Sequence, residues 1–255
     1  MSSEILLGGL ATVVAVAIAV GAALLVQRYI PVDGRQENND VAGIAFAIIG
    51  VLYAILLTFV TISVWETSDS AKESTRNEAR DIVNLNHYAD TLPAPDRARL
   101  RALTDHYVQL VEQDEWPAMA KGRPVGGQGG ATLDAIWSLV DGPPPADDGL
   151  AARQAEARGD LKDLTSARDA RLAAIGAGLP RVMWFALLVG AALTLGNALM
   201  FGVRGSGQYI TIIAMLAAMS ALMLFAVYEL EYPYQRGESV TVSVFDDVLG
   251  GQTAR

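Results

Sequence analysis

The chain contains no cysteine and only two histidines, His87 and His106. The first absence excludes disulfides, thiolate metal ligands and cysteine nucleophiles. The two histidines fall in separate predicted helices, where a structural role is the more common one. The phosphate-loop pattern G-x-x-x-x-G-K-[ST], the nucleophile-elbow pattern G-x-S-x-G and the zinc pattern H-E-x-x-H are also missing. We therefore expect no enzyme activity.

Charge is missing from four long stretches, although the whole chain has a formal net charge of −9. The negative balance argues against a nucleic-acid partner. The uncharged segments 5–26, 41–64, 182–203 and 209–228 are each 20 residues or longer. An α-helix needs about 20 apolar residues to cross the hydrocarbon core of a bilayer. The sequence therefore predicts a multi-pass membrane protein with four transmembrane helices.

Basic residues are scarce in two of the connecting loops. If the chain crosses four times, loops 27–40 and 204–208 share one side of the membrane. Their only basic residues are Arg28, Arg35 and Arg204. The N-terminus, the central region and the C-terminal tail share the other side, which carries the remaining Lys and Arg. By the positive-inside rule, we expect the central region and both termini to be cytoplasmic.

The segments between the spans read as helices, and no period-two strand pattern is sustained. A single helix is expected to continue from the second span past Trp65 as far as Pro93. An amphipathic helix from Pro95, a short helix over 132–140 and a charged helix from Leu150 follow, separated by Gly- and Pro-rich loops. We expect an all-α fold of two plus two membrane helices with a central helical region formed partly by extensions of them. The expected divisions are 1–65, 66–180, 181–230 and 231–255.

Small or weakly polar residues form a stripe along the second span. They recur every three or four positions, which places them on one face of a helix. Two interpretations remain open: the stripe allows another helix to approach closely, or it lines a narrow pore in which hydroxyls and backbone dipoles meet an ion. The residues are Gly43, Ala47, Gly50, Ala54, Thr58, Thr61 and Trp65.

Ionisable residues are absent from all four spans, which disfavours a transporter coupled to protons or ions. A passive pathway does not need such groups. The most polar residue inside a span is Asn197. Its amide is expected to face another helix or a water-filled cavity.

Two carboxylates, Glu229 and Glu231, follow the fourth span. In one interpretation they are hydrated groups beside an interfacial belt formed by Tyr228, Tyr232 and Tyr234. In the other, together with Asp246 and Asp247 of the tail, they form a cation-binding or gating site.

Several short motifs, taken in order, resemble the bestrophin-like domain family of bacterial membrane proteins. Near the C-terminus the family pattern is Leu-Asp-x-Pro-Phe followed by glycine. Here Glu231 replaces the aspartate, Tyr234 replaces the phenylalanine, and Gly237 comes one residue late. The resemblance covers nearly the whole chain and rests on Tyr53, Trp65, Glu78-Ala79, Leu92-Pro93, Tyr107, "EWPAM" at 115–119 and "LEYPYQRGESV" at 230–240.

The resemblance implies a function by analogy with bestrophins, which are oligomeric anion channels with a pore lined by the second transmembrane helix and calcium bound by cytoplasmic acidic residues. We therefore expect a homo-oligomer in the bacterial inner membrane that conducts small inorganic ions, with anions preferred to cations. The expected pore-lining residues are Gly50, Ala54, Thr58, Thr61 and Trp65. The resemblance implies no cofactor other than Ca²⁺ at the acidic cluster.

A second hypothesis is a non-conducting scaffold or sensor that recruits a partner through its cytoplasmic helices. Glu115 and Trp116 would then form the contact surface, because an exposed tryptophan is a common interface anchor. The competing interpretation of Trp116 places it in the core of the helical region itself.

Overall fold

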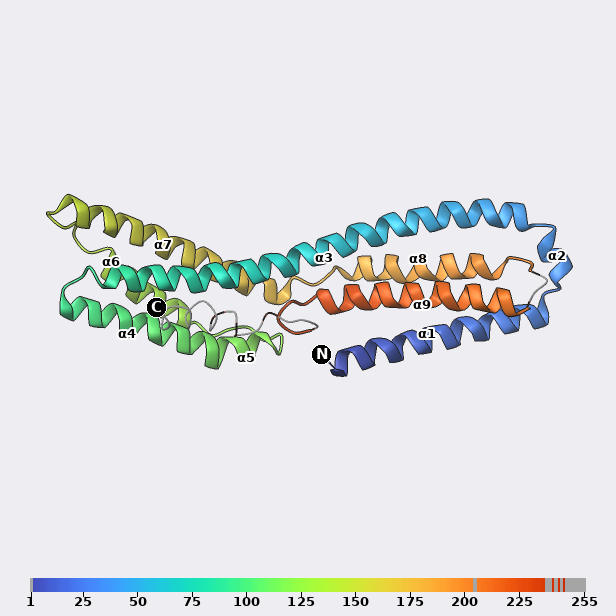
Figure 1. The fold of residues 1–255 in the computed structure, drawn as a ribbon, viewed down its shortest axis with the longest axis horizontal. Helices are drawn as coiled ribbons and strands as arrows, with labels where there is room; N and C mark the ends of the chain where they lie inside the picture. Colours follow the sequence, from blue (N-terminus) through green and yellow to red (C-terminus); the bar gives the residue numbers. More distant parts are fainter. Residues whose placement is uncertain (1, 204–205, 237–239, 241–242, 244, 246–255) are drawn as a thin grey trace. The chain divides into compact units, whose positions relative to one another are not determined.

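The computed structural model describes residues 2–203, 206–236, 240, 243 and 245. These residues form helices, turns and connecting segments, and no strand occurs among them, as predicted (Figure 1). The chain divides into two compact units. The first unit is Met1–Glu66 with Gly178–Glu231, and the second unit is Thr67–Ala177 with Tyr232–Arg255.

The first unit contains the four long apolar helices that the sequence predicts, and each is long and apolar enough to cross a membrane. They are α1 (Ser2–Tyr29), the first part of α3 (Asn39–Ala89), α8 (Arg181–Leu199) and α9 (Ser206–Leu230). Many of their large aliphatic side chains are exposed. Such exposure is unfavourable in water but is what lipid-facing helices require.

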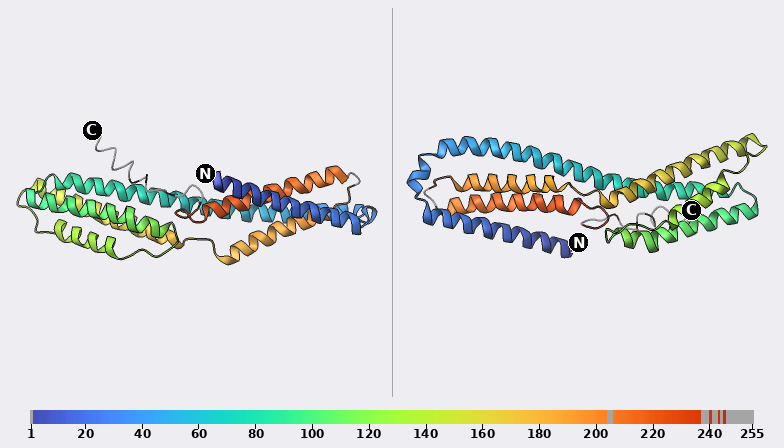
Figure 2. Two further views of the ribbon diagram at one scale, coloured as in Figure 1. Left: turned by 90° about the horizontal axis from the view of Figure 1, so that it is seen from below. Right: turned by 180° about the vertical axis from the view of Figure 1, so that it is seen from behind.

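The helices of the first unit pack through small residues. Helices α1 and α9 lie side by side (Figure 2), and Ala23, Ile213 and Ala217 are buried in the cluster that α1, α8 and α9 share. Helix α3 packs on α8 through Tyr53, which lies against Gly190. Small side chains let membrane helices approach closely and gain van der Waals contact.

A short helix, α2 (Val32–Gln36), occupies the first connecting loop, where the sequence predicts only a loop. Its Arg35 is 6% exposed and donates hydrogen bonds to the carbonyl oxygens of Leu199 at 3.4 Å and Phe201 at 3.1 Å. These carbonyls lie at the C-terminal end of α8, where a helix lacks internal donors and favours a cation. Arg35 therefore ties α2 to the end of α8.

The second unit begins within α3, which runs for 51 residues and ends at Ala89, four residues before Pro93. The predicted long helix is confirmed. The unit continues with α4 (Ala94–Leu110), a π-helix (Val111–Glu115), α5 (Trp116–Met119), α6 (Gln128–Val140), α7 (Asp148–Ala173) and a 3-10 turn (Ala174–Gly176). Helix α6 starts four residues earlier than the sequence suggests, because the end of the Gly-rich segment joins it.

The core of the second unit brings together residues from every one of its long helices. Tyr234, which follows α9, is 3% exposed and belongs to this core. For Tyr234, the interpretation as part of an interfacial belt is therefore wrong. Its ring packs edge-to-face on Trp116 at 5.8 Å between centroids. The fully buried residues of the core include Leu85, Leu100, Tyr107, Ile136, Leu161 and Leu164.

Candidate functional site

The stripe of small residues on α3 remains open in the first unit. Ala54 and Thr58 are exposed, Gly50 and Thr61 are partly exposed, and Trp65 is 64% exposed. None of the other helices that the structure describes therefore covers this face. It is available to lipid, to water or to another copy of the chain.

Helix α3 carries three faces of different chemistry within the membrane. Because residues advance about 100° each along a helix, Tyr53, Val60 and Val64 fall on one face, and that face packs on α8. The stripe lies roughly 100° around the helix from this packed face. Beyond the stripe, a third face presents large aliphatic and aromatic side chains that are exposed: Ile44, Ile48, Val51, Ile55, Phe59 and Ile62.

Helix α3 therefore has two exposed surfaces: the stripe, and the face of large aliphatic and aromatic side chains, called the bulky face below. The bulky face suits lipid chains, which offer only dispersion contacts. The stripe offers hydroxyls and close access to the backbone instead. The side chain of Thr58 donates to the carbonyl oxygen of Ala54 at 2.7 Å, and Thr61 donates to that of Leu57 at 2.8 Å. Each hydroxyl oxygen therefore keeps its lone pairs outward while its proton is held by the helix.

Asn197 of α8 lies against the backbone of α3. In the orientation that satisfies both ends of its amide, it donates to the carbonyl oxygen of Ala42 at 3.2 Å and accepts from the N–H of Phe46 at 3.3 Å. The expectation that this amide faces another helix is confirmed. The amide therefore does not face lipid. Its two hydrogen bonds fix the position of α8 on α3.

Glu231, just after α9, accepts hydrogen bonds from groups at the start of α8. It is 5% exposed, and its Oε1 accepts from the backbone N–H of Leu179 at 2.9 Å and from the indole N–H of Trp184 at 3.0 Å. Leu179 lies two residues before Arg181, the first residue of α8, so its backbone N–H has no partner within the helix. The carboxylate therefore holds the start of α8 against the end of α9.

The other members of the proposed cation or gating site are placed differently. Glu229 is half-buried at the end of α9, and Asp246 and Asp247 lie outside the described residues. Within the described part of the chain, no three His, Asp or Glu side chains are grouped so that they could hold a metal ion. Calcium binding by this set therefore stays a prediction.

Glu115 and Trp116 lie in the interior of the second unit, with 3% and 8% of their surfaces exposed. The interpretation of Trp116 as a core residue is the correct one, and an exposed partner anchor at these positions is not present. Glu115 is the last residue of the π-helix Val111–Glu115, and Trp116 is the first residue of α5. Pro117 has no N–H to donate to the preceding turn, and the wider π-turn accommodates it. Glu115, at the end of this π-helix, is buried in the second unit.

Glu115 joins a buried ionic network. Arg171 of α7 is fully buried; its Nη2 lies 2.6 Å from Glu115 Oε2, and its Nε lies 2.6 Å from Glu78 Oε2. Arg168, one turn earlier on α7, pairs with the other oxygen of Glu115. The Tyr107 hydroxyl donates to Glu78 Oε1 at 2.5 Å. Two guanidinium groups thus face two carboxylates, as buried charges require.

Two groups of this network, Tyr107 and Arg171, have raised pKa values. Burial, followed by the negative charge of Glu78, raises the pKa of the Tyr107 hydroxyl well above its usual value, so that it stays a donor. Burial alone would lower the pKa of Arg171, but the charge and hydrogen bonds of Glu78 outweigh it and raise that pKa. The guanidinium of Arg171 therefore remains charged, and its Cζ atom lies over the ring of Trp116, 5.6 Å from the ring centre.

The network and the rings around it bring several of the family motifs together. Glu78, Tyr107, Glu115, Trp116 and Tyr234 are far apart in the sequence but meet in one cluster. Arg168 and Arg171 complete it, and the sequence interpretation missed them because a charged helix usually indicates a solvated face. A signal was present: both arginines lie three apart on the face that carries Leu161 and Leu164.

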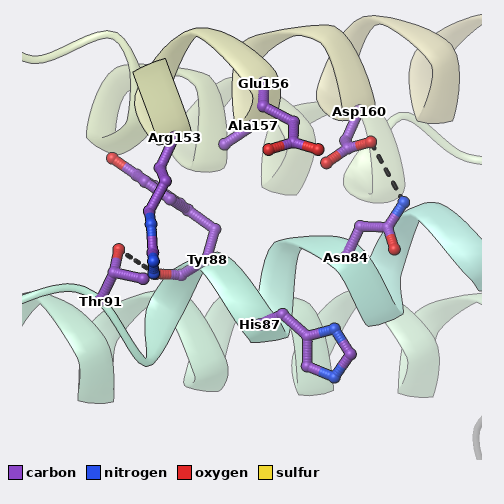
Figure 3. Close-up of a pocket in the computed structure, with 8 residues that line it drawn as sticks. All are labelled: Asn84, His87, Tyr88, Thr91, Arg153, Glu156, Ala157 and Asp160. Carbon is purple, nitrogen blue, oxygen red and sulfur yellow. Dashed lines mark hydrogen bonds between the residues drawn. The ribbon is translucent and has the colours of Figure 1, made fainter. Parts of the chain in front are cut away.

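A polar hollow of about 250 Å³ lies between the second-unit part of α3 and α7 (Figure 3). Asn84 of α3 donates to Asp160 Oδ1 of α7 at 3.1 Å across one end of it. Arg153 and Glu156, both exposed, bring charges of both signs to its α7 side. Such mixed, solvated side chains are typical of a groove between helices.

Comparisons with known proteins agree with this fold. Two crystal structures of single-residue variants of a bacterial bestrophin homologue from Klebsiella pneumoniae are similar to the chain, at 11% and 12% identity with TM-scores of 0.70 and 0.64. The first alignment covers 93% of this chain and 97% of the other, and the second covers 94% and 99%. A structure described as a membrane protein variant is similar with a TM-score of 0.66 at 11% identity, over 93% of this chain and 95% of the other.

At these identities the structural likeness establishes the fold alone. Among curated proteins, none matches the chain significantly. The family model of the Bestrophin-like domain matches residues 13–245, which is nearly the whole chain and includes both the stripe on α3 and the buried network. The chain therefore belongs to the Bestrophin-like domain family.

Proposed function

We propose that the protein assembles with copies of itself into a passive ion-conducting pathway for small inorganic anions. In this proposal the stripe on α3 faces the assembly axis, and the bulky face of α3 meets lipid. The observation that carries the proposal is the separation of these two exposed faces on one helix. A helix that met only lipid would have no need for a second exposed face of Gly, Ala and Thr.

Two further features support a passive mechanism. The four spans contain no charged residue, so no group within them is suited to proton or ion coupling. Membership of a family named for its similarity to bestrophins supports the assembly and the choice of anions by analogy. In the same proposal the protein lies in the bacterial inner membrane with both termini cytoplasmic, as the basic residues indicate.

In this proposal an anion in the pathway contacts the hydroxyls of Thr58 and Thr61. Both protons are engaged by backbone carbonyls of α3. An anion needs a donor, so a hydroxyl must rotate away from its carbonyl to bind it. Weak, transient contacts of this kind suit conduction, which requires that an ion be released as readily as it is bound. Trp65, at the end of the stripe, narrows the exit.

The test is anion flux from liposomes that contain the purified full-length protein. The wild type should release chloride faster than protein-free vesicles. The Thr58→Leu and Thr61→Leu variants should reduce the flux at least several-fold, because leucine fills a narrow pathway. Thr58→Val, which removes the hydroxyl at nearly constant volume, should retain more flux than Thr58→Leu.

The matched control is Thr211→Leu on α9. Thr211 is also exposed, and its hydroxyl also donates to a backbone carbonyl four residues earlier, that of Gly207 at 2.9 Å. This variant should conduct like the wild type. Equal flux from wild-type and empty vesicles, with or without added calcium, would contradict the proposal.

A further inference from the structure

A second hollow, of about 500 Å³, lies between α3 and α7 within the second unit. Its lining is dominated by oxygen-bearing side chains. Ser70, Ser74 and Ser166 line it, together with Glu73, Asp81 and Asp163. Asn77 and Arg80 also belong to its lining. None of these residues stands out as a site in the sequence.

Asp81 differs from the other carboxylates that line this hollow. Glu73 and Asp163 are exposed to a greater extent, whereas Asp81 is only 9% exposed. Its Oδ2 is buried and has no hydrogen-bond partner among the described residues. A buried carboxylate oxygen without a partner loses the hydration that it has in water, and this loss is unfavourable when the group is charged. Something must neutralise it.

Other negative charges on α3 and α7 make the charged form of Asp81 still less favourable. Burial, followed by the charges of Asp160 and Asp163 on α7, raises the pKa of Asp81 to about 6, and Glu78 adds to the rise. Arg80 opposes the rise. Arg80 is itself exposed, and its Nη1 donates to Asn77 Oδ1 at 3.4 Å. The region around Asp81 is therefore short of positive charge.

We propose that the hollow binds a small monovalent inorganic cation, Na⁺ or K⁺, with Asp81 as its charged ligand and serine hydroxyls and the Asn77 amide as neutral oxygen ligands. A cation held in the hollow balances the negative charge of the Asp81 carboxylate, whose Oδ2 is buried without a partner. The proposal is independent of whether the protein conducts ions, because the hollow is formed by residues of the second unit alone.

The donor set favours a monovalent ion over a divalent one. Calcium is usually held by six to eight oxygens with several carboxylates among them. Over the described residues, no three acidic or histidine side chains converge closely enough to hold a metal ion. One buried carboxylate with hydroxyl and amide oxygens can balance a single positive charge but not two.

The experiment is thermal unfolding of the full-length protein in detergent, in chloride salts of Na⁺, K⁺ or the bulky cation N-methyl-D-glucamine at equal ionic strength. A ligand that binds only the folded state raises Tm. Above about pH 7, Na⁺ or K⁺ should raise Tm by a few degrees over N-methyl-D-glucamine. Below about pH 5 the difference should vanish, because protonation then neutralises Asp81.

Single-residue variants test whether the dependence of Tm on Na⁺ or K⁺ arises from Asp81. Asp81→Asn should abolish the cation dependence and raise Tm in N-methyl-D-glucamine, since the unpaired charge is gone. Arg80→Gln should enlarge the cation dependence, because a competing positive charge is removed. Asp169→Asn is the control: Asp169 is an exposed aspartate of α7 that does not line the hollow, and its variant should behave like the wild type.

Three results would overturn the proposal. The first is a Tm that does not distinguish Na⁺ or K⁺ from N-methyl-D-glucamine in the wild type. The second is a cation dependence that persists in Asp81→Asn, or, if that variant does not fold, one that persists in the wild type at low pH. The third is stabilisation by Ca²⁺ with none by Na⁺ or K⁺, which would exclude a monovalent ligand.

Discussion

Arg171 and Glu78 form an ion pair with no exposed surface on either side chain, with Nε and Oε2 2.6 Å apart. They are 93 positions apart in the sequence and join α7 to α3 within the second unit. A charge buried in this way is stable only while its partner remains. Loss of either partner would therefore leave an uncompensated charge between these two helices.

Arg171→Met should destabilise the protein strongly. The substitution leaves Glu78 and Glu115 buried without their shared cation, a change that costs about 3–5 kcal/mol in buried pairs. The double variant Arg171→Met with Glu78→Gln should recover part of the loss, because one uncompensated charge is removed. The measurement is chemical or thermal unfolding of the purified protein in detergent.

The control for this prediction is the pair Arg101 and Asp90, which are 2.6 Å apart but about half exposed, at 51% and 53%. Exposed pairs contribute about 0–1 kcal/mol. Arg101→Met should therefore change stability little. A similar loss for both variants would show that the buried network is not a special source of stability.

Gly190→Ala should weaken the packing of α8 on α3. A methyl group at this position would overlap the ring of Tyr53, which is 8% exposed and cannot move aside freely. Overpacking of this kind typically costs about 1–3 kcal/mol. The change is measured as a fall in Tm of the full-length protein.

Gly196→Ala on the same helix is the matched control, because nothing lies within 4 Å of the position that its methyl group would take. It should be neutral or slightly stabilising, since alanine favours helix over glycine. If Gly190→Ala were equally harmless, the close approach of α3 and α8 would not depend on this glycine.

The helices were predictable from the sequence because they follow from local properties. Uncharged stretches of about 20 residues predict spans whatever the rest of the chain does. The run from Trp65 to Pro93 lacks helix breakers, so α3 was also predictable. The short α2 was not, because its five residues have no apolar periodicity and it is held by the contact of Arg35 with the end of α8.

The buried network was only partly predictable, because it depends on long-range contacts. Glu78, Tyr107 and Glu115 were recognised as motif residues, but nothing local shows that they share a cation. Arg171 belongs to a charged helix, and a charge in such a helix usually faces solvent. Likewise, Tyr234 follows a membrane span, where an aromatic residue is usually interfacial. Only the fold reveals that both enter the core of the second unit.

Glu231→Gln and Glu231→Ala separate an anchor from a cation ligand. As an anchor, Glu231 needs only an acceptor oxygen for Leu179 N–H and the Trp184 indole N–H. Glutamine retains that oxygen, so Glu231→Gln should be nearly as stable as the wild type. Alanine leaves both donors without this partner and should cost about 1–3 kcal/mol for each.

The ion response of the two Glu231 variants is the decisive comparison. A carboxylate that binds a cation loses that ability equally in Gln and in Ala. If any calcium dependence of stability or flux disappears in Glu231→Gln while its Tm is unchanged, the carboxylate is a ligand. If Glu231→Gln behaves like the wild type throughout, Glu231 is an anchor.

Tyr234→Phe should lower stability by about 1–2 kcal/mol at neutral pH. The Tyr234 hydroxyl donates to the carbonyl oxygen of Ala71 at 3.1 Å and lies 3.3 Å from the hydroxyl of Thr75. Phenylalanine keeps the edge-to-face contact with Trp116 but leaves the Ala71 carbonyl without this donor. The loss therefore reports the hydrogen bonds and not the ring packing.

The same variant has a signature at alkaline pH. Burial raises the pKa of Tyr234 to about 12 in the folded protein, against about 10 in an unfolded chain. The folded state therefore favours the protonated hydroxyl, and its contribution is complete below about pH 10 and is lost as the pH rises toward about 12. Measured from about pH 10 to about pH 12, the free energy of unfolding should fall by less in Tyr234→Phe than in the wild type. Equal slopes for the two proteins would mean that Tyr234 ionises as easily in the folded state as in the unfolded one, which its place in the core of the second unit does not allow.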